Sequence, residues 1–420
     1  METETAPAGT IPTSGADESG LRPIPRISIQ AFCQSSSTAG VLERASSDRR
    51  LNKAHVKGHM GGVAAAVEFY QHAPTPNLII VECEGSQEKL LADLDSLAEF
   101  CDSGTMVIVI GQINDVTLYR ELMHRGVSEY LVAPFDVYQL IAAIGRLYNG
   151  PETAPLGKVI SFFGVKGGCG ASTIAHNCAW ALAKNLENEV IIADLDLPFG
   201  TAGLDFNRDP LQGVYEAVAS PERLDETFLD RILSECSEYL TLLAAPASLE
   251  RTYDHAEATF EGLVDVMRSS SPLVTLDVPH TWNAWTKNVL ASADELVLVA
   301  EPDLANLRNA KNVVDTFKQL RPNDRPPHLV LNRVGMPKRP EIKPADFATA
   351  LDLHQHTEIP FDPQLFGTAA NNGQMIGEVD AKNPITETFS MLAANVSGKQ
   401  RLDADKKASL GSLLSKLVRK

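Results

Sequence analysis

The chain has 420 residues, a length that predicts about two or three domains. Hydrophobic residues make up 44% and charged residues 22%, which excludes collagen, coiled coil and wholesale disorder. The formal net charge is −17, and this acidic balance argues against nucleic acid as a partner. The six cysteines have no metal-binding spacing, so we expect reduced thiols.

Residues 1–25 are rich in Pro, Thr and Gly and hold almost no large apolar side chains. We expect them to form a disordered tail, because they cannot bury enough surface to offset the entropy of ordering. The chain has no recognisable signal peptide and no apolar run long enough to span a membrane, which predicts a cytoplasmic protein.

Short apolar runs alternate with helical patterns over residues 26–148. The runs are "RISIQAF", "NLIIVECE", "TMVIVIG" and "EYLVAPF". Such βα alternation predicts an α/β domain built on a parallel sheet. The turn-forming segment 149–157 follows, and we expect it to be a linker.

A second series of apolar runs occupies residues 158–397 and predicts a larger, doubly wound parallel-sheet domain. The series begins with "KVISFFGV" and continues with "EVIIADLDL", "YLTLLAA", "SPLVTLDV", "ELVLVAE" and "HLVLNRV". Helix-sized stretches separate these runs. The expected fold class is therefore α/β in both domains.

The glycine-rich segment "KGGCGAST" stands between the first of these strands and a predicted helix. Glycines at this place let the backbone turn tightly and direct amide N–H groups and a helix N-terminus at a phosphate chain. The segment resembles the deviant Walker A motif, K-G-G-x-G-K-S/T, of the ParA/MinD family of P-loop ATPases. The implied nucleotide-binding residues are Lys166, Gly167, Gly168, Cys169, Gly170, Ala171, Ser172 and Thr173.

Acidic residues at later strand ends extend this resemblance. Asp194 and Asp196 end the run "VIIADLD", and Asp277 ends "LVTLD" at the Walker B position; taken singly, each would also suit a helix N-cap. The resemblance implies ATP and Mg²⁺ as cofactors, with Ser172, Asp196 and Asp277 around the metal ion. It further implies that Asn332 recognises adenine, although a lone Asn also suits a turn, and that the segment 359–376 closes the base pocket.

The lysine of the motif is absent, because Ala171 stands in its place. In phosphoryl transfer this lysine neutralises charge on the β- and γ-phosphates, so the loss predicts binding with at most weak hydrolysis. The resemblance implies two remaining catalytic residues. Lys166 would reach the phosphates of a second subunit in a homodimer, and Asp196 would position water.

The first domain is similar to a response-regulator receiver in its order of elements and in "HRGVSEYLVAPFD". Its chemistry is missing: Glu82 stands at the phosphoacceptor position, Gly111 at the hydroxyl position and Ala133 at the lysine position. We therefore expect a docking or dimerisation module rather than an aspartyl phosphate switch, with Glu82 a strand-end acid without a regulatory role.

Residues 398–420 form a basic C-terminal segment in which leucines recur at helical spacing, which predicts an amphipathic helix. Two interpretations stay open. The helix packs on the protein's own surface or frays, or it anchors weakly on an anionic membrane or on a partner helix.

An atypical receiver followed by a P-loop domain without its lysine closely resembles the CpaE/TadZ group of Flp-type (tight adherence) pilus assembly proteins. The resemblance implies an ATP-binding localisation factor, cytoplasmic or peripheral on the inner membrane at a cell pole. Its receiver-like domain would bind pilus secretion machinery or a polar landmark. The alternative is an active MinD-like ATPase that cycles on the membrane and positions division or motility machinery, but Ala171 favours the first hypothesis.

Overall fold

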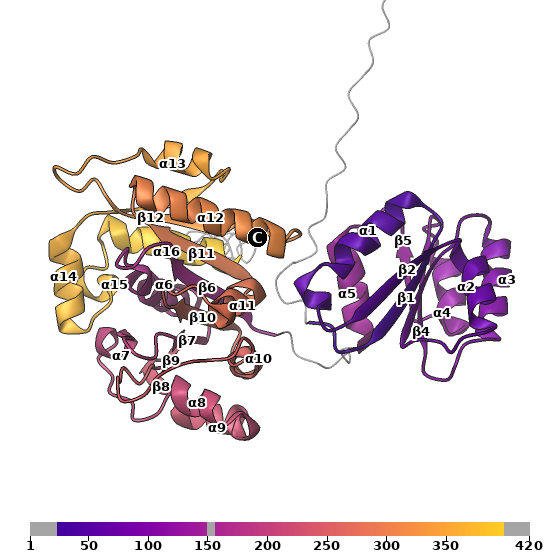
Figure 1. Ribbon diagram of the computed structural model, residues 1–420, viewed down its shortest axis with the longest axis horizontal. Helices are drawn as coiled ribbons and strands as arrows, with labels where there is room; N and C mark the ends of the chain where they lie inside the picture. Colours follow the sequence, from indigo (N-terminus) through magenta and orange to yellow (C-terminus); the bar gives the residue numbers. More distant parts are fainter. Residues whose placement is uncertain (1–22, 149–155, 399–420) are drawn as a thin grey trace, which may run out of the picture. The chain divides into compact units, whose positions relative to one another are not determined.

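The computed structural model describes residues 23–148 and 156–398, which form two units (Figure 1). Most of the predicted tail and linker, and nearly all of the predicted basic helix, lie outside the described residues. One boundary needs correction. Ile24, which we assigned to the tail, is fully buried, and its amide donates to the Arg50 carbonyl at 2.8 Å, because its side chain completes the core of the first unit.

The first unit is a five-stranded parallel sheet with the strand order β2-β1-β3-β4-β5. This is the flavodoxin-like order of a doubly wound sheet. Helices α1 and α5 cover one face, and α2, α3 and α4 cover the other (Figure 1). The elements are β1 (Ser28–Cys33), α1 (Ser36–Ser46), β2 (His55–Met60), α2 (Gly62–Tyr70), β3 (Leu78–Glu82), α3 (Gln87–Ala98), β4 (Met106–Gly111), α4 (Val116–His124), β5 (Glu129–Val132) and α5 (Val137–Tyr148).

The second unit is an eight-stranded sheet with the order β13-β12-β11-β6-β10-β7-β9-β8, in which only the β8–β9 pair is antiparallel. Its strands are β6 (Lys158–Gly164), β7 (Val190–Asp194), β8 (Ser234–Ser237), β9 (Leu240–Leu243), β10 (Leu273–Val278), β11 (Glu295–Ala300), β12 (His328–Val334) and β13 (His356–Pro360).

Helices surround this second sheet (Figure 1). Apolar clusters lie on both of its faces. The helices are α6 (Ala171–Leu186), α7 (Ala202–Asp205), α8 (Val214–Ala219), α9 (Glu226–Ile232), α10 (Glu261–Ser270), α11 (Ala284–Ser292), α12 (Leu304–Leu320), α13 (Pro344–Ala350), α14 (Pro363–Asn372), α15 (Ile376–Val379) and α16 (Pro384–Ser397). Within the two described ranges, no helix is long and apolar enough to cross a membrane.

The central strands are buried along their whole length, as every residue of β6, β10 and β11 shows. Parallel sheets covered on both faces need such continuous apolar runs, which is why these strands were predictable. The predicted fold class, α/β with doubly wound parallel sheets, is confirmed for both units. Three strands were not predicted, namely β2, β8 and β13, and each lies at an edge of its sheet.

Candidate nucleotide site

The glycine turn joins β6 directly to α6. Gly168 and Gly170 have φ angles of +80° and +88°, a left-handed conformation that glycine adopts without strain. Gly170 also permits a close approach, because a Cβ atom there would lie 2.5 Å from Nδ2 of Asn332. No side chain caps the N-terminus of the helix, and an uncapped helix N-terminus is a place where backbone N–H groups can bind an anion.

Neighbouring strands hold this turn in place. The Val165 amide donates to the Val299 carbonyl at 3.0 Å, and the buried Cys169 thiol donates to the same oxygen at 3.2 Å. From β12, Asn332 Nδ2 donates to the Cys169 carbonyl at 2.8 Å. Cys169 is thus a buried anchor of the turn, and its side chain does not face a ligand.

The side chains of the predicted phosphate site differ in their exposure and in the groups they contact. Ser172 and Thr173 are partly exposed in the first turn of α6. Ala171 offers only a methyl group there. Lys166 is 49% exposed, and its Nζ lies 3.9 Å from Oδ2 of Asp303. Such a long, exposed ion pair contributes little stability, so the ammonium group is free to exchange partners.

Two predicted acids meet at the end of the sheet, because Asp194 and Asp277 are register partners on β7 and β10. Both are buried. Asp194 accepts from the Asp196 amide at 3.0 Å and from the Ala202 amide at 3.1 Å. Burial and then the charge of Asp277 raise the pKa of Asp194 to about 7. Burial, followed by the same charge, also raises the pKa of the half-buried Asp196.

His176, on α6, was missed by the sequence analysis. It is fully buried, with Nδ1 2.7 Å from Oδ2 of Asp205 and Nε2 3.4 Å from Oδ2 of Asp277. Burial alone would lower its pKa, but the hydrogen bond to Asp205 and the nearby carboxylates of Asp205 and Asp277 outweigh burial and raise the pKa to about 10. Its spacing of one helical turn from Ser172 is the signal that would have found it.

The acid cluster suits a divalent cation. Ring and carboxylate atoms of His176, Asp194 and Asp277 all lie within 4.8 Å of one another, but an imidazole with a pKa of about 10 is protonated at neutral pH and does not bind a metal ion. Two carboxylates buried side by side repel each other, and a cation relieves that repulsion. Carboxylate and hydroxyl oxygens are also the ligands that Mg²⁺ prefers, so the predicted set of Ser172, Asp196 and Asp277 fits this ion chemically.

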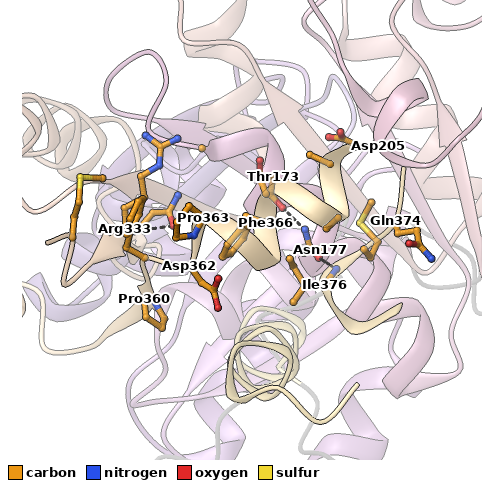
Figure 2. Close-up of a pocket in the computed structure, with 17 residues that line it drawn as sticks. Thr173, Asn177, Asp205, Arg333, Pro360, Asp362, Pro363, Phe366, Gln374 and Ile376 are labelled. Carbon is orange, nitrogen blue, oxygen red and sulfur yellow. Dashed lines mark hydrogen bonds between the residues drawn. The ribbon is translucent and has the colours of Figure 1, made fainter. Parts of the chain in front are cut away.

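A cavity of about 360 Å³ lies beside the turn, within the size range of ligand pockets. Figure 2 shows its wall, where Asn177 of α6 accepts a hydrogen bond from the Ile376 amide at 2.7 Å. The predicted base-pocket segment lines the cavity from Pro360 to Ile376. Asn332 also lines it; its Oδ1 accepts from the Arg333 amide at 2.9 Å, which leaves one N–H and one lone pair for a ligand.

In the first unit, hydrogen bonds occupy both carboxylate oxygens of Glu82, whereas a phosphoacceptor needs a free carboxylate oxygen. It is 4% exposed. Its Oε2 accepts from the Gln34 and Ser35 amides at 2.7 and 2.8 Å, and its Oε1 accepts from the Ser35 and Thr38 hydroxyls at 2.6 and 2.7 Å. The carboxylate thus joins the end of β3 to the start of α1.

The fold and this site define a class. The strand–glycine turn–helix unit, with acids at neighbouring strand ends, gives the second unit a fold similar to that of ParA/MinD P-loop proteins. Residues 157–328 match the family model AAA_31, described as an AAA domain. Septum site-determining protein MinD of Bacillus subtilis is 25% identical over 263 residues, covering 58% of this chain and 90% of that protein.

Two solved structures extend the comparison. A ParA family ATPase from Chlorobium tepidum has a TM-score of 0.51 and 25% identity, covering 57% of this chain and 98% of that chain. The pilus assembly protein CpaE from Caulobacter crescentus is 52% identical, covering 30% of this chain and 96% of that chain, with a TM-score of 0.30.

Proposed function

We propose that the protein binds ATP with Mg²⁺ at the glycine turn and serves as a localisation and assembly factor of a Flp-type pilus secretion machine, with weak or no hydrolysis. One observation supports ATP binding with weak or no hydrolysis. The backbone cradle and the adjoining cavity are intact, whereas position 171 holds a methyl group. Backbone amides bind phosphate without any side chain, but transition-state charge needs a cation.

In this proposal the triphosphate lies on the amides of residues 167–173 and the base enters the cavity beside Asn332. Ser172, Asp196 and Asp277 would hold Mg²⁺, which supplies positive charge to the phosphates when bound. Asp196 is the half-buried acid of the cluster, and its raised pKa suits a carboxylate that accepts a proton from water.

We propose a second copy of the chain as a partner of this face. Lys166 is half exposed and weakly paired, as a lysine that serves another subunit needs to be. Segments that follow the carboxyl ends of β7, β10 and β11 carry exposed apolar side chains. Phe199 (68% exposed) and Trp282 (52%) lie in loops, and Leu304 (73%) begins α12. Exposed large apolar groups that gather at one edge of a sheet favour an interaction surface.

The proposed role in pilus assembly rests on two departures from family patterns, one in each unit of the chain. The receiver-like unit has a hydrogen-bonded glutamate in place of a phosphoacceptor, and the P-loop domain lacks its lysine. This combination is similar to the CpaE/TadZ group. The receiver-like unit would then bind pilus machinery or a polar landmark in the cytoplasm. Membrane contact through residues 398–420 stays a proposal, since that segment lies almost entirely outside the described residues.

The test compares nucleotide binding with turnover in the full chain. Calorimetry with and without Mg²⁺ is expected to detect ATP binding, while phosphate release from the wild type is slow. Ala171→Lys is expected to raise the release rate, and Ala350→Lys, on exposed α13, is the matched control. Rapid release by the wild type would favour the MinD-like cycling ATPase. Absence of ATP binding at millimolar concentration would refute the nucleotide proposal.

A further inference from the structure

His280 lies beside the glycine turn, in the loop that follows β10. Strands β10 and β6 are paired, and Val278 is the register partner of Phe163, so this loop runs alongside the start of the turn. His280 Nδ1 is 2.6 Å from the carbonyl oxygen of Gly164. Since a carbonyl oxygen only accepts, Nδ1 carries the hydrogen of this bond. Nε2 is therefore the nitrogen available to a ligand.

The ring is also oriented by its packing. Its centroid lies 5.8 Å from that of Phe163, a buried side chain that gives the imidazole a fixed support. A Cβ atom built on Gly167 would meet Cδ2 of His280 first, at 3.6 Å. Cδ2 is bonded to Nε2, so this edge of the ring borders the glycine turn. The imidazole itself is exposed, so a phosphate can reach it without removing a covering group.

We propose that His280 contacts the terminal phosphate of the bound nucleoside triphosphate and supplies part of the charge that Ala171 cannot. This inference rests on the proposed nucleotide site. As an imidazolium, the side chain donates from Nδ1 to Gly164 and from Nε2 to a phosphate oxygen. In this contact His280, which follows β10, takes the place of the lysine that the glycine turn lacks at position 171.

The test separates the phosphate contact from the anchoring bond to Gly164. His280→Asn keeps a donor near the position of Nδ1 but lacks Nε2, whereas His280→Gln places a donor near the position of Nε2. Calorimetry on the full chain would measure ATP and ADP binding for both variants, with Mg²⁺ present. His354→Ala, an exposed residue after α13, is the control.

His280→Asn is expected to weaken ATP binding about tenfold, the cost of one charge-assisted hydrogen bond, and to leave ADP binding within about twofold. His280→Gln, which donates without the charge, is expected to lose less ATP affinity than His280→Asn, and the control to retain all of it. Equal weakening of ATP and ADP would overturn the proposal in favour of a structural role, as would unchanged ATP binding by His280→Asn. If the wild type binds neither nucleotide, the proposed function itself fails.

Discussion

Removal of the Glu82 carboxylate offers a quantitative test of the first unit. Glu82→Ala leaves the Gln34 and Ser35 amides without their acceptor in a buried place, at about 1–3 kcal/mol for each unsatisfied donor. The Ser35 and Thr38 hydroxyls also lose a partner but are free to rotate. We therefore expect the free energy of unfolding to fall by about 3–5 kcal/mol.

Glu82→Gln is expected to cost less. The amide oxygen still accepts from the two backbone N–H groups, and the new NH₂ group donates to the Thr38 hydroxyl. Ser35 Oγ already accepts from the Ser37 hydroxyl and the Thr38 amide. What is lost is the bond from the Ser35 hydroxyl and the charge of the acceptor, together worth about 1–3 kcal/mol. Glu84→Ala, two residues further on and exposed, is the matched control and should stay within about 0.5 kcal/mol.

The assay is urea denaturation of the full chain, with hydrogen exchange over β1 and α1 to assign the transition to the first unit, because two units need not unfold together. Burial alone would raise the pKa of Glu82, but hydrogen bonds from Ser35, Thr38 and Gln34 outweigh burial and lower it. The stability that the Glu82 carboxylate gives to the folded state is therefore fully present above the ordinary glutamate pKa. It is lost as pH falls through the lower pKa that this group has in the folded state. A Glu82→Ala variant as stable as Glu84→Ala would refute the reasoning.

Two further substitutions test the second unit. Gly170→Ala places a Cβ 2.5 Å from Asn332 Nδ2 at a φ of +88°, so calorimetry should show ATP affinity at least about tenfold lower. Gly262→Ala, on α10, where a Cβ meets nothing within 4 Å, should bind normally. His176→Leu leaves buried carboxylates without their partner and should lower the free energy of unfolding in guanidinium by about 3–5 kcal/mol. An unchanged unfolding midpoint would mean that the imidazole does not balance those acids.

The sequence by itself determined the central strands and the glycine turn. Strands such as β6 and β10 are buried on both faces, so their apolar runs are continuous and do not depend on which neighbours they acquire. The turn is equally local, because left-handed φ angles at Gly168 and Gly170 are a requirement that glycine meets without strain.

Only the tertiary structure decided the sheet edges and the composition of the acid cluster. Edge strands such as β2 are largely exposed and carry no apolar pattern, so pairing with a neighbour is what makes them strands. Asp194 and Asp277 lie more than eighty residues apart in the chain and meet because β7 pairs with β10. His176 joins them because α6 packs against that pair. Its helical spacing from Ser172 marks the residue in the sequence, but only the packing decides which acids it meets.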